Sequence, residues 1–187
     1  MTGHVHVAVV ASGGGTNLQS LLDTLNGTNH PAARVTQVIS NRKGAGALER
    51  ARQAGVPTHV IADPTSATEY IEALGDAQLV VLAGYLKLIP ATVVSRFRWR
   101  MVNIHPALLP EFGGPGMYGI RVHEAVLAAG VKESGASVHY VTEEYDRQGT
   151  GWSRYFVCPG CGKRHDPKNR VLELGYHAEG YWKVDKC

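Results

Sequence analysis

Residues 5–25 read VHVAVVASGGGTNLQSLLDTL, an apolar run followed by three glycines and a second apolar pattern. The first part, Val5 to Ala11, is apolar at almost every position, which predicts a β-strand buried on both faces of a sheet. Glycines follow, and then apolar residues recur from Leu18 to Leu25 with the spacing of an amphipathic helix. A buried strand, a glycine-rich turn and a helix in this order predict the first βα unit of a parallel sheet.

The same alternation of strand and helix continues along the chain. Further helices are expected at residues 45–54, 65–74, 91–97 and 122–129. Further strands are expected at residues 34–40, 57–62, 78–83, 101–105 and 135–141. The sequence therefore predicts an α/β fold with a doubly wound, mostly parallel, Rossmann-like sheet. In such folds ligands bind beyond the carboxyl ends of the strands.

The composition is that of a globular protein. The chain has 187 residues, of which 44% are hydrophobic and 19% charged, which excludes disordered and collagen-like proteins. The longest apolar stretch, residues 77–86, is far shorter than the ~20 residues of a membrane-spanning helix. No signal peptide is visible before the first strand. We therefore expect a cytoplasmic protein, a monomer or homodimer, that acts on small molecules and has no membrane partner.

Charge divides the chain into two regions. Residues 1–146 contain 11 basic and 12 acidic residues, whereas residues 147–187 contain 8 basic and 4 acidic residues and all three cysteines. We therefore predict an α/β domain over 1–146 and an atypical basic, cysteine-containing tail over 147–187. The excess positive charge is confined to this tail, which has no recognisable nucleic-acid-binding motif, so no nucleic-acid partner is expected.

Three polar segments follow predicted strands, and the first is the loop Ser12–Asn17. Glycines allow its backbone to approach a ligand, and backbone N–H groups with the Thr16 hydroxyl favour a phosphate. The loop matches neither the dinucleotide fingerprint nor the nucleoside-triphosphate loop, so NAD and ATP are not its expected ligands. The alternative is a tight turn in which Thr16 caps the helix.

The second and third segments carry candidate catalytic side chains. Asn103 and His105 lie two residues apart on one strand, so their side chains face the same side and can stabilise a carbonyl oxygen that gains negative charge. Asp146 ends an acidic run that would reach the same rim and orient His105. The alternatives are a strand end with His105 bonded to the backbone, and a solvated acidic turn. His139, in mid-strand, is interpreted as a packed or hydrogen-bonded histidine.

Several segments together resemble a known enzyme family. They are SGGGTN (12–17), ISN (39–41), VLAGYLKLI (81–89), NIHPALLP (103–110) and GPGMYG (114–119) with His123. In their order and spacing, over about residues 5–146, the sequence resembles the phosphoribosylglycinamide formyltransferases, folate-dependent enzymes of purine synthesis. The segment 103–110 is shared with related formyltransferases, whereas 116–119 before a histidine-containing helix is typical of the glycinamide ribonucleotide branch.

The resemblance implies transfer of a formyl group from 10-formyltetrahydrofolate to the amine of glycinamide ribonucleotide, with no metal required. It assigns the phosphate of the ribonucleotide to Gly15, Thr16 and Asn17. It assigns the folate site to Leu86, Lys87, Leu88, Ile89 and Asn103. It assigns stabilisation of the oxyanion to Asn103 and His105, while Asp146 would keep His105 protonated and relay the proton of the amine.

The resemblance ends just after Asp146, where the family continues with further strands and a closing helix. The C-terminal part of the fold is therefore expected to be replaced or missing. In the tail, Cys158 and Cys161 have the spacing of a zinc knuckle, which His165, His177 or Cys187 could complete. The alternatives are free thiols in an irregular tail, or a tail that arose from a shifted reading frame.

Two other functions remain open at this point. One is a related formyltransferase or a formyltetrahydrofolate hydrolase, against which the candidate phosphate loop argues. The other is a non-catalytic protein that binds nucleotide and folate and carries a metal-binding tail.

Overall fold

The computed structural model describes residues 4–114, 116–131, 134–142, 175–176 and 182–183. The chain divides into two compact units, Met1–Val102 and Asn103–Cys187. Strands of the main sheet follow the order β3-β2-β1-β4-β5-β6. A separate antiparallel pair consists of β7 (Gly175–Tyr176) and β8 (Trp182–Lys183). The predicted boundary between a domain and a tail at residue 146 lies outside the described residues.

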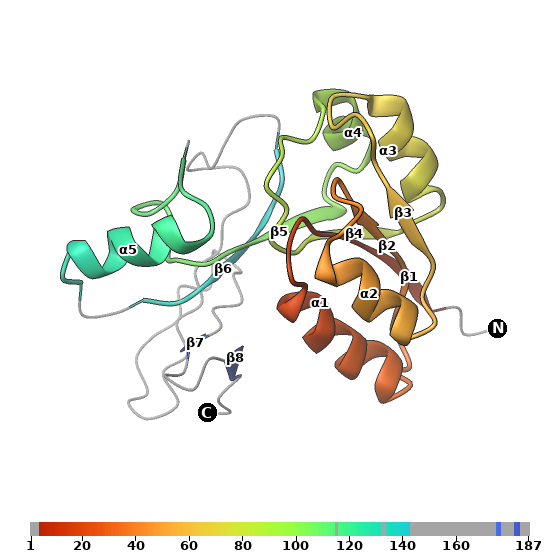
Figure 1. Cartoon of the computed structure of the whole chain (residues 1–187), viewed down its shortest axis with the longest axis horizontal. Coiled ribbons are helices and arrows are strands. Elements are labelled where there is room, and N and C mark those ends of the chain that lie inside the picture. The colour runs from red at the N-terminus through yellow and green to blue at the C-terminus, as the bar shows by residue number, and fades with distance from the viewer. Residues whose placement is uncertain (1–3, 115, 132–133, 143–174, 177–181, 184–187) are drawn as a thin grey trace. The chain divides into compact units, whose positions relative to one another are not determined.

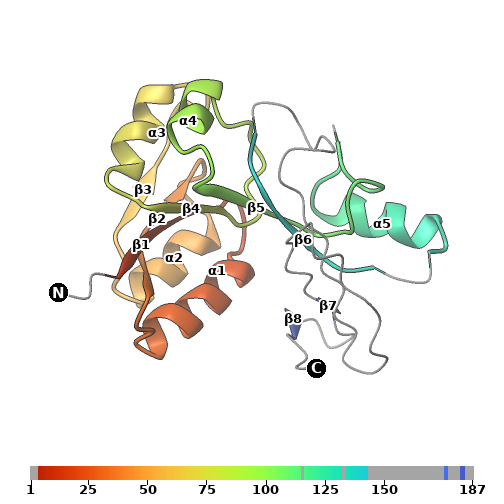
Figure 2. The same cartoon turned by 180° about the vertical axis from the view of Figure 1, so that it is seen from behind.

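The first unit is a doubly wound sheet. Its strands are β1 (Val5–Val10), β2 (Ala33–Ser40), β3 (Thr58–Val60) and β4 (Leu79–Leu82). Its helices are α1 (Thr16–Leu21), η1 (Leu22–Gly27), α2 (Gly46–Gln53), α3 (Ala67–Leu74) and α4 (Ala91–Arg96). The pairs β1/β2, β1/β4 and β2/β3 are all parallel. Helices α1 and α2 lie on one side of these strands, and α3 and α4 on the other (Figures 1 and 2). The predicted fold class is thus confirmed.

Strand β1 forms the centre of this unit. From Val7 to Val10 the strand is at most 1% exposed and therefore buried on both faces, whereas Val5 is 38% exposed and His6 partly exposed, so the burial expected from Val5 begins at Val7. It pairs with β2 on one edge and β4 on the other. The buried carboxyl-terminal half of β1 therefore leads directly into the glycine loop.

The first helix is longer than its apolar pattern predicts. It begins at Thr16, continues as a π-helix and ends at Gly27. At its end the Asn26 side chain donates to the Val35 carbonyl (3.0 Å) and accepts from the Val35 N–H (2.9 Å), which ties the helix to β2. Gly15 occupies the N-cap position and no side chain caps the helix, so the alternative role of Thr16 as a cap is not observed.

Helix α3 has the start and stop signals that its sequence contains. The Ser66 hydroxyl accepts a hydrogen bond from the Glu69 N–H (3.3 Å), and the Glu69 carboxylate accepts one from the Ala62 N–H (2.6 Å). The helix stops at Gly75, whose φ of +49° favours glycine. Both ends of α3 are therefore set by local chemistry.

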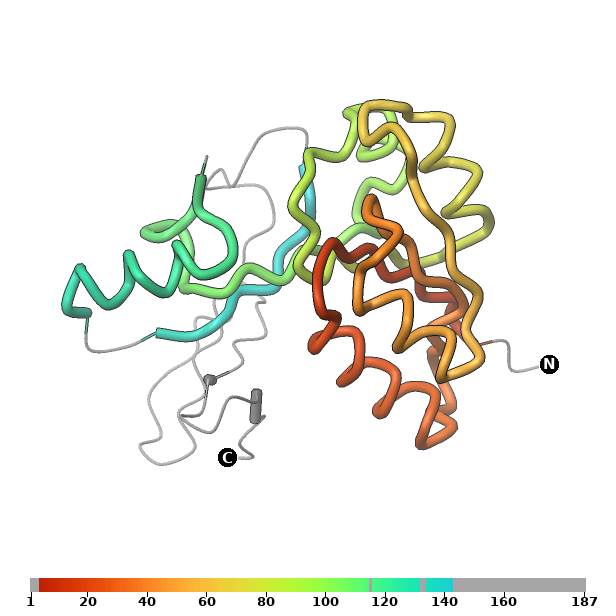
Figure 3. Tube along the Cα trace, viewed as in Figure 1, coloured from red at the N-terminus to blue at the C-terminus, as the bar shows by residue number. Residues whose placement is uncertain are grey.

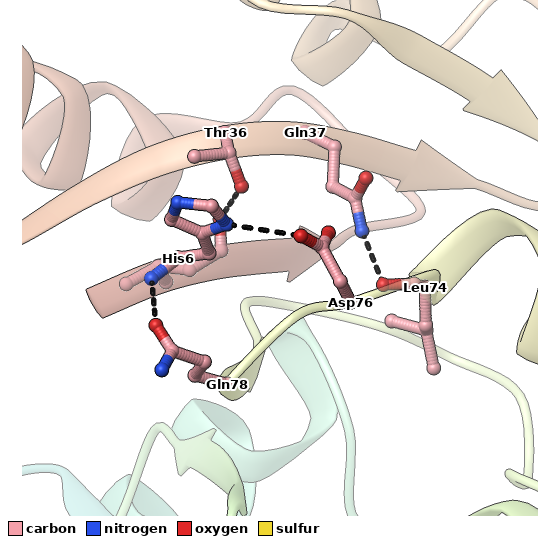
Figure 4. Close-up of polar contacts among 7 residues, drawn as sticks. His6, Thr36, Gln37, Leu74, Asp76 and Gln78 are labelled. Atoms are coloured by element: carbon pink, nitrogen blue, oxygen red, sulfur yellow. Dashed lines mark hydrogen bonds and ion pairs between the residues drawn. The ribbon is translucent and has the colours of Figure 1, made fainter. Parts of the chain in front are cut away.

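Polar side chains fasten the segment that joins α3 to β4 (Figure 4). The His6 N–H donates to the Gln78 side chain (3.0 Å), and the His6 ring lies 3.3 Å from an Asp76 carboxylate oxygen. On β2, Gln37 donates to the Leu74 carbonyl (2.6 Å). Next to it, Thr36 is the extra residue of a bulge in the β1/β2 register. These contacts involve the amino-terminal part of β1, away from the strand ends that carry the candidate site.

The second unit contains β5 from Asn103 onward (strand bounds Met101–His105), α5 (Ile120–Ala128) and β6 (Ser137–Tyr140). Its core cluster is formed by Ala107, Val122 and Val126, against which Phe112 and Met117 pack. In the described part of the chain, no helix is long and apolar enough to cross a membrane.

Candidate functional site

The glycine loop follows β1, and its shape requires glycine at position 15. Gly15 has φ +76°, and a Cβ added there would lie 2.6 Å from the Ala47 Cα. The Gly13 carbonyl accepts a hydrogen bond from the Ala47 N–H (3.1 Å). The loop and the start of α2 are therefore in direct backbone contact, and Figure 3 shows the two segments side by side.

Arg50 is a contact of this loop that the sequence analysis did not identify. Its Nε donates to the Gly14 carbonyl (2.8 Å), and its Nη1 donates to the Gln19 side chain (3.0 Å). A guanidinium therefore lies at the loop that the sequence assigns to a phosphate. Arginine at this point of a helix is common on protein surfaces, so the sequence alone contained no signal for this contact.

The candidate folate residues follow β4. Leu86 is 40% exposed and Leu88 is 62% exposed, with the exposed Lys87 between them. Ile89, by contrast, is 6% exposed and contributes to the core. Three of the four predicted residues thus offer an apolar surface with a positive charge, which suits a flat ring system attached to an anionic group.

Two tyrosines anchor the beginning of this loop. The hydroxyls of Tyr70 on α3 and Tyr85 form a short hydrogen bond, and their rings meet edge to face at 6.4 Å between centroids. Burial raises the pKa of Tyr85, and the hydrogen bond to Tyr70 raises it further. Burial likewise raises the pKa of Tyr70. Both phenols therefore keep their protons at alkaline pH.

This pair should make stability depend on pH in the alkaline range. A phenol whose pKa is higher in the folded than in the unfolded chain stabilises the fold fully below about pH 10, and that contribution is lost as pH rises further. As pH rises above about 10, the urea midpoint should therefore fall less steeply in Tyr85→Phe than in the unmodified chain. Tyr118→Phe is the matched control, because Tyr118 is 47% exposed. Equal slopes in all three proteins would contradict the assignment.

In the second unit, Asn103 and His105 lie on β5 as predicted. His105 is 4% exposed, and its Nε2 lies 2.7 Å from the Phe112 carbonyl oxygen. Because a carbonyl only accepts, Nε2 carries the hydrogen of this bond. The backbone bond expected as the alternative for His105 therefore exists, and it fixes the orientation of the ring.

Asn103 contacts His139, a pairing that the sequence analysis did not identify. The Asn103 Nδ2 lies 2.9 Å from the His139 Nε2, and the His139 Nδ1 lies 3.1 Å from the Tyr140 carbonyl oxygen. A neutral imidazole protonated at Nδ1 satisfies both contacts. His139 is 7% exposed and hydrogen-bonded, which confirms its interpretation as a packed, hydrogen-bonded histidine. Its bond to Asn103 also orients the Asn103 side chain.

Asp146 and the tail cysteines lie outside the described residues. The role expected of Asp146 therefore stays a prediction, and the zinc knuckle of Cys158 and Cys161 stays one hypothesis for the tail beside free thiols and a shifted reading frame. Within the described ranges, no group of three or more His, Cys, Asp or Glu side chains is arranged to hold a metal ion.

Comparison with known proteins gives a consistent result over the region that contains these residues. A family model described as formyl transferase matches residues 5–150. Phosphoribosylglycinamide formyltransferase, chloroplastic, of Arabidopsis thaliana is 42% identical over 154 residues, which are 75% of this chain and 51% of that protein. Phosphoribosylglycinamide formyltransferase of Escherichia coli (strain K12) is 39% identical over 153 residues, 76% of this chain and 68% of that protein.

A solved structure agrees with these relatives. Glycinamide ribonucleotide transformylase 1 from Geobacillus kaustophilus is 37% identical and superposes with a TM-score of 0.68. The alignment covers 77% of this chain and 78% of that one. The chain spans about half the length of the chloroplastic relatives it matches.

Proposed function

Because the chain belongs to the formyl transferase family, we propose that it transfers a formyl group from 10-formyltetrahydrofolate to the amine of glycinamide ribonucleotide in purine synthesis. The observation that carries this proposal is the pair Asn103 and His105, two residues apart on β5 in the matched region, with His105 buried. The names of the relatives supply the formyl group and its acceptor, and the folate donor is proposed from the resemblance of the sequence. These names do not specify a compartment for this chain, because some relatives are named chloroplastic. A cytoplasmic location therefore stays a prediction.

The two substrates are assigned to the two loops of the first unit. Gly15, Thr16 and Asn17 hold the phosphate of the ribonucleotide through backbone N–H groups and the Thr16 hydroxyl. Leu86 and Leu88 cover the pterin ring, and Lys87 faces the anionic part of the folate. The exposure of these three side chains supports this assignment. Ile89 is buried and packs in the core.

Asn103 and His105 stabilise the charge that develops during transfer. The folate supplies an activated formyl group, and the amine of the ribonucleotide forms a bond to its carbonyl carbon. Asn103 has two amide hydrogens: one points to His139, and the other donates to the carbonyl oxygen as it becomes negative. His105 donates to the same oxygen through Nδ1, as the imidazolium that Asp146 is proposed to maintain, while its Nε2 hydrogen stays on the Phe112 carbonyl. The carbon–nitrogen bond to folate then breaks, and the folate nitrogen takes up a proton.

Asp146 is proposed to relay the proton that leaves the amine, directly or through water. Its assignment rests on the resemblance of the sequence. Positioning two substrates and stabilising an oxyanion is sufficient for this reaction class, so no metal is assigned a role.

The test is a transfer assay on the full chain beside Asp146→Asn. The unmodified chain should produce tetrahydrofolate only when glycinamide ribonucleotide is present, and Asp146→Asn should lower kcat by about 10²-fold or more. Formation of tetrahydrofolate and formate without the nucleotide would instead indicate a formyltetrahydrofolate hydrolase. Binding of both substrates with no turnover would indicate a non-catalytic binding protein, and no binding at all would contradict the proposal.

A further inference from the structure

Ser12 lies at the carboxyl end of β1 and is 1% exposed. Its N–H donates to the Gly84 carbonyl (3.2 Å), next to the bond from the Ala11 N–H to the Ile39 carbonyl (2.9 Å). The backbone therefore extends the pairing of β1 with both neighbouring strands by one residue. A hydroxyl buried at this point costs free energy unless it is hydrogen-bonded.

The hydroxyl of Ser12 satisfies this requirement through two other segments. It donates its only hydrogen to the Asn41 Oδ1 (2.7 Å) and accepts a hydrogen bond from the Leu86 N–H (3.0 Å). Because Asn41 takes the hydrogen, a lone pair of the oxygen must face Leu86. The orientation of the hydroxyl is thus determined, and with it the position of the Leu86 backbone.

Through these contacts Ser12 links the two loops that the proposed function assigns to substrates. Ser12 is the first residue of the glycine loop 12–17, and Leu86 belongs to the candidate folate loop 85–89. Tyr85, directly before Leu86, is held separately by Tyr70. The folate loop therefore has one anchor shared with the glycine loop and one that is independent of it.

We propose that Ser12 is a positioning residue that fixes the geometry of both substrate loops at once, through its bonds to Leu86 and Asn41. This inference rests on the proposed function, because it takes the two loops as substrate sites. Ser12 itself touches neither substrate. Its effect on binding comes from holding the Leu86 backbone, and the start of the glycine loop, in the positions that the substrates require.

The consequence is energetic coupling between the two sites. A ligand that stabilises the glycine loop in this geometry also stabilises the Ser12 anchor and the Leu86 backbone that it holds, and the reverse holds as well, because coupling between two binding sites is reciprocal. Glycinamide ribonucleotide should therefore increase the affinity for folate, and folate should increase the affinity for the ribonucleotide by the same factor.

This coupling can be measured by isothermal titration calorimetry. The affinities for glycinamide ribonucleotide and for tetrahydrofolate are each determined in the absence and in the presence of the other ligand. Tetrahydrofolate carries no formyl group, so no reaction occurs. In the unmodified full chain each ligand should tighten the other about fivefold or more. In Ser12→Ala both individual affinities should fall, and the coupling factor should approach one. In Tyr70→Phe only the affinity for tetrahydrofolate should fall, because that hydroxyl contacts the folate loop alone.

Three variants separate positioning from general destabilisation. Asn41→Asp keeps an acceptor for the Ser12 hydroxyl and should retain the coupling, whereas Asn41→Leu should lose it as Ser12→Ala does. Ser66→Ala removes the side-chain cap of α3, so it should lower the stability without changing either affinity. Undiminished coupling in folded Ser12→Ala and Asn41→Leu would overturn the proposal. If Ser12→Ala does not fold, the two Asn41 variants decide.

The experiment also distinguishes this inference from the proposed function. If the unmodified chain binds neither ligand, the proposed function fails. Hydrogen exchange at the Leu86 amide then tests the anchor by itself. The amide should be protected in the unmodified chain and exchange at least tenfold faster in Ser12→Ala, and equal exchange in both would show that the hydroxyl does not hold the loop.

Discussion

Replacing His105 with alanine is expected to lower kcat for formyl transfer by about 10²- to 10³-fold, while KM for both substrates changes only a few-fold. The imidazole is assigned to an oxygen that becomes negative only as the reaction proceeds, so its loss should affect the transition state more than substrate binding. Its buried position and its bond to the Phe112 carbonyl hold the ring in one orientation, which is what such a role requires.

A folded but inactive protein must be distinguished from an unfolded one, since alanine leaves a cavity at a buried position. His105→Gln fills most of that space and retains an N–H that can donate to Phe112, but it carries no positive charge to stabilise the oxyanion. It should therefore fold and still lose most of its activity. His59→Ala, on exposed β3, is the matched control and should behave as the unmodified chain. Activity within threefold of normal in folded His105→Gln would remove His105 from the mechanism.

Most of the fold could be predicted because its signals are local. The apolar run of β1 and the spacing of apolar residues in the first helix each lie within one segment, and the structure contains both elements. The strand expected at 101–105 is observed with those bounds. The predicted bounds of the short edge strand β3 were less accurate, because it covers 58–60 where 57–62 was expected.

The side-chain contacts of the candidate site could not be predicted in the same way. Ser12 and Leu86 are 74 residues apart in the sequence, and Asn103 and His139 are 36 apart. Such pairs depend on which strands become neighbours and in which register, and no periodicity encodes this. The glycine loop and the Asn103/His105 pair were found because each lies within a few residues, whereas the partners that orient them were not.

Gly15→Ala is expected to be strongly destabilising. A residue with a side chain is strained at φ +76°, which costs about 1–2 kcal/mol. The added Cβ would also lie 2.6 Å from the Ala47 Cα, a main-chain atom that cannot move aside cheaply, and forced packing of this kind costs about 1–3 kcal/mol more. The free energy of unfolding should fall by about 2–5 kcal/mol, as urea denaturation can measure.

The functional effect should exceed what the loss of stability explains, because relief of the clash requires the glycine loop to move away from α2. KM for glycinamide ribonucleotide should rise about tenfold or more even where the protein is fully folded, since misplaced backbone donors lose much of their interaction with a phosphate. Gly55→Ala is the matched control: Gly55 also has positive φ (+68°), but nothing lies within 4 Å of an added Cβ. It should lose stability through backbone strain alone and bind the ribonucleotide normally. If both variants lost the same stability, and neither changed KM, the close approach of Gly15 to Ala47 would have no part in shaping the phosphate site.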